Sequence, residues 1–126
     1  MSTAPIILQE GTYTPRDVDA LGKRARETRD VFSFQLRELF EIVHPELLLS
    51  VDKERMCADF VDARLAAAAA GDWVLFPWSG VLCHTVAETE YFRLRTNRNR
   101  NIITAEEQET LRHSCIAIAG LSVGSN

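Results

Sequence analysis

The sequence predicts a mainly α-helical protein with a small β-hairpin, an α+β fold, followed by the beginning of an α/β unit. Three observations support this prediction. Apolar residues recur at helical spacing through the first half of the chain. Two short apolar runs flank a turn rich in proline and glycine. A run of small apolar residues near the C-terminus then leads directly into a glycine-rich segment.

Composition limits the classes of partner. The chain has 126 residues and a formal net charge of −4, which gives no general attraction to nucleic acid or to an anionic membrane. No apolar run approaches the roughly 20 residues that span a bilayer. The three cysteines are widely spaced and form no CxxC pair, which favours buried thiols in a reducing cytoplasm over a disulfide framework or a zinc site. We therefore expect a cytoplasmic protein without a nucleic-acid or membrane partner.

The first half of the chain is predicted to be helical. Residues 1–13 show no periodicity and are expected to form a loose or partly docked leader. A helix is expected to follow Thr14, because a hydroxyl N-cap, a proline and then an acid occur in order. Apolar spacing predicts a second helix over 32–43, which Pro45 ends. A third helix is predicted from about 52 to 71, with a glycine as its C-cap.

The sequence pattern of the following residues is that of a β-hairpin. Residues 73–76 and 81–86 are apolar runs joined by Pro77-Trp78-Ser79-Gly80, which indicates a β-hairpin with a four-residue loop. A short helix is predicted over 87–94. Residues 14–92 are therefore interpreted as a helix-rich accessory module with a hairpin near 73–86.

Residues 93–126 are predicted to start a different domain. A connector rich in arginine and asparagine covers 95–101, and a capping box of Thr104 and Glu107 opens one more helix. Residues 115–119 are small and apolar on both faces, which is typical of a strand buried in a parallel sheet.

This predicted strand ends directly in a glycine loop. Glycines in such a loop allow backbone N–H groups to approach a phosphate, and a following helix presents its positive end there. The GxGxxG spacing is met only at Gly120, because Ser122 and Ser125 occupy the other two glycine positions and Gly124 is additional. The spacing alone leaves two interpretations open, a phosphate-binding loop and a plain strand-to-helix turn.

The order of these features resembles the opening of the ThiF/MoeB family, which includes the ubiquitin-activating enzymes and their bacterial relatives. The stretch Arg98-Asn99-Arg100-Asn101-Ile102-Ile103, the capped helix, the aliphatic strand and the glycine loop match it in order and spacing, over about a quarter of the chain. The resemblance implies that an incomplete Rossmann-like α/β domain begins here. It also implies binding of ATP and Mg, and adenylation of the carboxylate of a small carrier protein or another acid, with release of pyrophosphate.

The resemblance assigns roles to particular residues. Arg100 aligns with the arginine of the family that acts across a homodimer on phosphates bound by the other subunit, and Arg98 is the second catalytic candidate. The glycine loop residues Gly120, Ser122, Gly124 and Ser125 are the expected nucleotide-binding positions. The alternative for the arginines is a solvated basic connector.

Two departures from the family pattern shape the functional prediction. The loop has fewer glycines than the common Gly-x-Gly-Gly-x-Gly. The acidic residue that holds a ribose about 20 positions past such a loop, and the lysine and the aspartate of the family, have no counterpart in the sequence. We therefore expect an N-terminal fragment of an adenylyltransferase that is inactive alone, although its parent is an enzyme.

Two other interpretations of the sequence remain open beside the adenylyltransferase fragment. The chain is alternatively a stand-alone helical protein-interaction module with a vestigial nucleotide-loop tail, or a dinucleotide-binding fragment of an oxidoreductase. No metal site is expected, because the three histidines form no constellation in the sequence. A catalytic Cys83–His84 pair is disfavoured, since adjacent residues of a strand point to opposite faces of the sheet.

Overall fold

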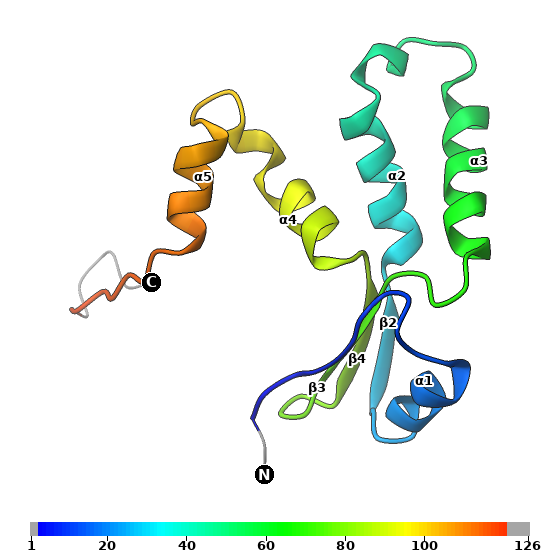
Figure 1. The fold of residues 1–126 in the computed structure, drawn as a ribbon, viewed down its shortest axis with the longest axis vertical. Helices are drawn as coiled ribbons and strands as arrows, with labels where there is room; N and C mark the ends of the chain where they lie inside the picture. Colours follow the sequence, from blue (N-terminus) through cyan, green and yellow to red (C-terminus); the bar gives the residue numbers. More distant parts are fainter. Residues whose placement is uncertain (1–2, 121–126) are drawn as a thin grey trace. The chain divides into compact units, whose positions relative to one another are not determined.

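The computed structural model of the chain describes residues 3–120 and divides the chain into two compact units, Met1–Arg95 and Thr96–Asn126 (Figure 1). Within the described residues the fold is α+β, with one mixed sheet of four strands and five α-helices. The whole sheet belongs to the first unit.

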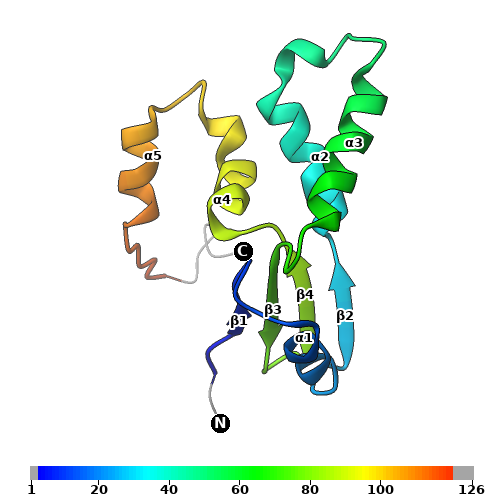
Figure 2. The same ribbon diagram turned by 45° about the vertical axis from the view of Figure 1, so that its right-hand side comes forward.

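The sheet has the strand order β1-β3-β4-β2 (Figure 2). Strand β3 (Asp72–Phe76) and strand β4 (Val81–Thr85) form the predicted antiparallel hairpin at its centre. Strand β1 (Ile6–Leu8) adds antiparallel to β3 at one edge, and β2 (Glu27–Asp30) adds parallel to β4 at the other. Segments from three distant parts of the sequence therefore meet in one sheet.

Helix α1 (Pro15–Gly22) covers one face of this sheet. Thr14 precedes it as predicted, and the Asp17 carboxylate accepts hydrogen bonds from the Thr14 N–H at 2.7 Å and from its hydroxyl at 2.8 Å. The buried side chain of Leu21 packs with Leu75 of β3 and Leu82 of β4. This small core fixes which face of each strand is turned toward α1.

Helices α2 (Phe32–Val43) and α3 (Lys53–Ala66) form a hairpin beyond one end of the sheet, and they lie side by side in Figures 1 and 2. Helix α2 has the predicted bounds, and a 3-10 turn over Pro45–Leu47 follows it. The largest core cluster lies between the helices and the end of β4, and its fully enclosed members include Phe32, Leu36 and Val86.

The remaining helices follow the hairpin strands in sequence. Helix α4 spans Glu88–Thr96, and a 3-10 turn over Asn97–Asn99 leads toward α5 (Ala105–Arg112). The predicted capping box of α5 is present: the Thr104 hydroxyl oxygen accepts the Glu107 N–H at 3.2 Å, and the Glu107 carboxylate accepts the Thr104 N–H at 2.7 Å. These two bonds satisfy backbone donors that the first turn of a helix leaves unpaired.

The predicted fold class, mainly α-helical with one hairpin and a Rossmann strand, is wrong. Two strands extend the hairpin into a four-stranded sheet, and neither carries a strand pattern in the sequence. Strand β1 is only three residues long and lies inside the predicted leader. Strand β2 reads Glu-Thr-Arg-Asp and is exposed along its whole length, so backbone pairing with β4 holds it rather than an apolar face.

The predicted strand over 115–119 is also absent. Residues 114–120 form no helix or strand in the structure, and the side chains of Ile116 and Ile118 are 77% and 81% exposed. A strand requires neighbours for its N–H and C=O groups, and no strand pairs with this segment among residues 3–120. Similarly, α3 ends at Ala66 rather than at Gly71, which lies in the loop before β3.

His84 of β4 joins most of these elements. Its ring stacks on Trp73 of β3 with centroids 4.2 Å apart and lies 4.5 Å from the ring of Phe32 in α2. Its Nε2 donates to the carbonyl oxygen of Ala70 at 2.8 Å, and its Nδ1 lies 3.2 Å from the Asp30 carboxylate. One buried side chain therefore ties two strands, the start of α2 and the loop before β3.

The loop before β3 tolerates only glycine at position 71. Gly71 has a φ of +71°, and a Cβ placed there would lie 2.7 Å from the carbonyl oxygen of Thr85 and 2.8 Å from the ring of Phe32. The Phe32 side chain is fully buried and the Thr85 carbonyl belongs to the backbone of β4, so neither can move aside cheaply.

We therefore expect Gly71→Ala to lower the free energy of unfolding by about 2 to 4 kcal/mol, from left-handed backbone strain and overpacking. Urea denaturation followed by circular dichroism measures this change. Gly22→Ala is the matched control, because its Cβ would meet nothing within 4 Å. Equal stabilities of the two variants would contradict the packing described here.

Candidate functional site

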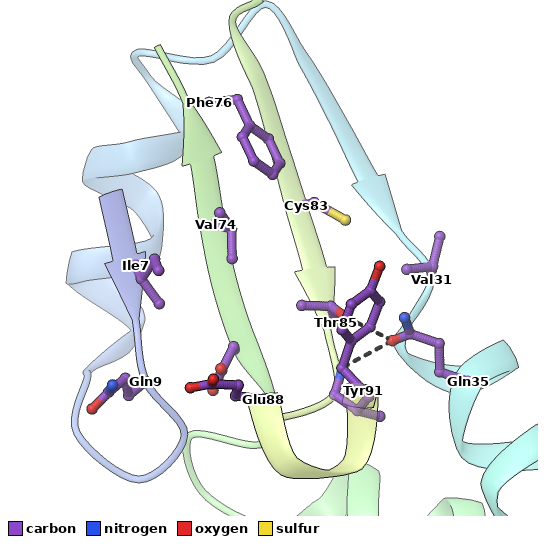
Figure 3. Close-up of a pocket in the computed structure, with 12 residues that line it drawn as sticks. Ile7, Gln9, Val31, Gln35, Val74, Phe76, Cys83, Thr85, Glu88 and Tyr91 are labelled. Atoms are coloured by element: carbon purple, nitrogen blue, oxygen red, sulfur yellow. Dashed lines mark hydrogen bonds between the residues drawn. The ribbon is translucent and has the colours of Figure 1, made fainter. Parts of the chain in front are cut away.

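The open face of the sheet, opposite α1, carries an apolar cleft of about 450 Å³ within the first unit (Figure 3). Its floor consists of strand side chains, and its sides come from α2, from α4 and from the segment after β1. The residues that line it are Ile7, Gln9, Val31, Gln35, Asp72, Val74, Phe76, Cys83, Thr85, Val86, Glu88 and Tyr91.

Successive side chains of a strand point to opposite faces of the sheet, which explains which residues form the floor of the cleft. Trp73 and Leu75 of β3 pack in the core beneath α1, so Val74 and Phe76 point to the other face. In β4 the same alternation buries Leu82 under α1 and directs Cys83 into the cleft. The strands are thus apolar on both faces, but α1 covers only one of them.

A glutamine shapes one wall of the cleft. The side-chain oxygen of Gln35 in α2 accepts the Thr85 hydroxyl at 2.9 Å and the Val86 N–H at 2.8 Å, as the dashed lines in Figure 3 show. These bonds satisfy the backbone where β4 ends and hold the first turn of α2 against it. Tyr91 of α4, which is 46% exposed, lines the same part of the cleft.

A buried carboxylate lies at the same end of the strands, because Asp72 is the register partner of Thr85. Asp72 is 8% exposed, and its Oδ1 accepts the Glu10 N–H at 2.8 Å. Burial raises the pKa of Asp72, and the carboxylates of Glu10, Glu88 and Glu90 raise it further. Asp72 therefore lies among other carboxylates at this end of the cleft.

The acidic end is structurally supported by an ion-pair network. Arg64 of α3 forms a bidentate pair with Glu90 of α4 at 2.7 and 2.9 Å, and its guanidinium lies 3.6 Å from Glu10. Glu10 in turn accepts the N–H of Gly71 at 2.7 Å. Arg64 thereby links α3, α4 and the segment after β1, while Asp72 lies beside this network and faces the cleft.

Cys83 does not have the surroundings of a catalytic nucleophile. Burial raises the pKa of its thiol, and the Asp30 carboxylate raises it further, so the thiolate is disfavoured. The neighbouring His84 lies on the opposite face of β4 and is engaged by Asp30 and Ala70. The cleft therefore has the character of a binding site rather than that of a cysteine-hydrolase site.

The residues that the sequence singled out lie in the second unit. Arg98 and Arg100 are both exposed, in and directly after the 3-10 turn, and neither belongs to an ion pair among residues 3–120. Gly120 is exposed with a φ of +129°, a backbone conformation that favours glycine. No hydrogen bond connects these three described residues. Ser122, Gly124 and Ser125 lie outside the described residues.

Within the described part of the chain, no group of three or more His, Cys, Asp and Glu side chains is arranged to hold a metal ion. In the same range, no helix combines the length and the apolar character that crossing a membrane requires.

Comparison with known proteins gives one partial likeness. The chain is 35% identical over 52 residues to "Uncharacterized protein MT1398" of Mycobacterium tuberculosis (strain CDC 1551 / Oshkosh). The aligned part is 41% of this chain and 7% of that protein, so the chain spans a small fraction of its length. No protein-family model matches the chain. No solved structure matches it either.

Sequence reasoning missed the cleft, although one signal pointed toward it. The run Trp73-Val74-Leu75-Phe76 is apolar at every position, whereas a strand with one solvated face alternates between apolar and polar residues. Such a run indicates that both faces of the hairpin are covered. The contributions of Gln35 and Tyr91 had no comparable signal, because they depend on where α2 and α4 begin.

The raised pKa of Asp72 gives a prediction with a definite sign. Between the unfolded and the folded pKa the native state holds the proton more tightly, so stability decreases as the pH rises through that window and stays lower above it. Asp72→Asn removes this penalty and keeps an oxygen for the Glu10 N–H. We expect the variant to be more stable than the wild type at pH 7.

Urea denaturation across the acid range tests this, because the stability difference should vanish below the unfolded pKa of 3.8. Asp59→Asn, at an exposed position of α3, is the control for removal of one charge. A destabilised Asp72→Asn variant at neutral pH would show that the ionised carboxylate is needed for the fold.

Proposed function

We propose that this chain is part of a ThiF-like adenylyltransferase, in which residues 93–126 open the ATP-binding domain and the preceding residues form an accessory module. The observation that carries the proposal is the order of features after residue 93: two arginines, two isoleucines, a capped helix, an aliphatic run and a glycine loop. The resemblance to the ThiF/MoeB family supplies the chemistry.

Two structural observations support this proposal. A helix with a capping box follows the arginine-containing turn, in the order that the resemblance predicts. Gly120 has a positive φ, a backbone conformation that glycine adopts readily in a turn.

The proposed reaction activates a carboxylate. An oxygen of the acid, the C-terminus of a small carrier protein or another carboxylate, attacks the α-phosphorus of ATP. The bond to the β-phosphate oxygen breaks, and pyrophosphate leaves. Arg100 suits the phosphate groups because a guanidinium is planar, permanently charged and able to donate two parallel hydrogen bonds. In a homodimer it would reach the nucleotide of the other subunit, and Arg98 is the second candidate.

The described residues offer no cluster of metal-ligating side chains, so a Mg²⁺ that accompanies ATP would be held by residues outside this set. The three cysteines are free thiols, which supports a reducing, cytoplasmic setting for the protein.

A second candidate function is that of a protein-interaction module, which the apolar cleft in the first unit favours. Unlike the adenylyltransferase proposal, the interaction-module hypothesis predicts that the native protein has no affinity for nucleotides. Titration with NAD beside ATP also separates adenylation from the oxidoreductase alternative.

We expect Arg100→Ala, made in the native full-length product that contains this chain, to weaken binding of Mg-ATP by about tenfold to a hundredfold. This is the loss of a charge-assisted hydrogen bond worth about 1.5 to 3 kcal/mol. Isothermal titration calorimetry measures the affinity, and Arg93→Ala on α4 is the matched control.

The outcomes of this titration test separate claims. Normal Mg-ATP affinity of the Arg100→Ala variant would exclude the proposed role of Arg100. Failure of the native full-length protein to bind Mg-ATP would contradict the adenylyltransferase proposal itself.

A further inference from the structure

The cleft on the open face of the sheet is independent of the nucleotide chemistry proposed above, because all its lining residues belong to the first unit. Its volume of about 450 Å³ lies within the range of small-molecule sites in proteins, about 300 to 1,000 Å³. Such sites are mostly apolar and carry a few polar groups that orient the ligand. The cleft has both properties.

The apolar part of the cleft is a continuous surface. Val74 and Phe76 of β3 and Cys83 of β4 form its floor, and Ile7 of β1 extends it toward the sheet edge. Ile7 lines the cleft with an apolar side chain that is 51% exposed to solvent. A ligand with an apolar body would remove this surface from water, which is favourable by about 25 cal/mol for each Å² buried.

The polar groups of the cleft are dominated by carboxylates at one end. Asp72 and Glu88 line it, and Glu10 and Glu90 lie close enough to raise the pKa of Asp72. Arg64 offsets part of this charge by pairing with Glu90 and Glu10. None of these ion pairs includes Asp72, so a cation at this end would be attracted by the Asp72 carboxylate, in an environment where burial strengthens electrostatic interactions.

We propose that the cleft binds a small organic cation, with its ammonium group beside Asp72 and its apolar body along Val74, Phe76 and Cys83. The charge of the cleft selects the charge of the ligand, and its size selects a body of one ring or a short chain. An anionic ligand would face Asp72 and Glu88, and a fully apolar ligand would leave a buried carboxylate without a compensating charge.

Cysteine labelling tests the proposal with an internal reference. Cys83 lines the cleft, whereas Cys115 is exposed in the second unit of the same molecule. The 126-residue chain is treated with a maleimide in the presence of 2-phenylethylammonium or of 2-phenylethanol, a neutral molecule of the same shape. Mass spectrometry then follows modification at each cysteine separately.

We expect the amine to slow labelling of Cys83 without changing that of Cys115, and the alcohol to protect at least about tenfold less well, since one charge-assisted interaction of about 1.5 kcal/mol corresponds to that factor. Asp72→Asn should remove the difference between amine and alcohol, whereas Asp59→Asn should preserve it. Backbone amide NMR shifts at Val74 and Phe76 give a second readout of where the amine binds.

Two results would overturn the proposal. Equal protection by amine and alcohol in the wild-type chain would mark the cleft as an apolar surface for another part of a protein. Absence of protection by either probe, together with unchanged amide shifts, would exclude a small-molecule site. Both comparisons use the wild-type chain, so they hold even if a variant fails to fold. Neither result bears on Mg-ATP binding by the full-length protein.

Discussion

The first unit depends on the surroundings of His84. The Ala70 carbonyl oxygen can only accept a hydrogen bond, so the Nε2 of His84 carries a proton. The Asp30 carboxylate opposite Nδ1 also accepts the Phe32 N–H at 3.1 Å, so the same oxygen anchors β2, begins α2 and holds the imidazole. The imidazole also packs against the rings of Trp73 and Phe32, whose centroids lie 4.2 and 4.5 Å away.

This arrangement determines where the cleft forms. Because His84 and Trp73 are register partners turned toward the core side, the next residues in each strand must face the other way. Cys83 and Val74 therefore share the open face, and they are register partners as well. Helix α2 begins beside Asp30, which brings Gln35 to the end of β4. The floor of the cleft and its α2 side are thus a consequence of the same contacts that stabilise the fold, and α4 and the segment after β1 complete the cleft.

The sequence predicted the parts of this fold that carry local signals. Helix α2 has its apolar spacing and a proline at its end, α1 and α5 have their caps, and β3 and β4 have their apolar runs around a turn. Strands β1 and β2 were not predictable in this way, because a three-residue strand and a fully exposed one are defined by their partners rather than by their side chains.

The opposite error occurred at 115–119, where an apolar run suggested a strand that has no partner among residues 3–120. Pairing between distant segments is the information that a pattern in one segment lacks.

The same distinction applies to function. The arginines and the glycine-rich segment could be singled out because the motif that they resemble is local in sequence. The cleft combines residues from β1, β3, β4, α2 and α4, so no local sequence motif predicts it.

A hairpin that is apolar on both faces needs a structural element or a ligand over each face, and α1 covers one of them. The other face combines apolar side chains with Asp72, a carboxylate buried among other acids. A purely structural cover would gain nothing from a charge at that position, whereas a ligand that carries the opposite charge would, and this is why the acidic end favours a bound cation over a neutral packing surface.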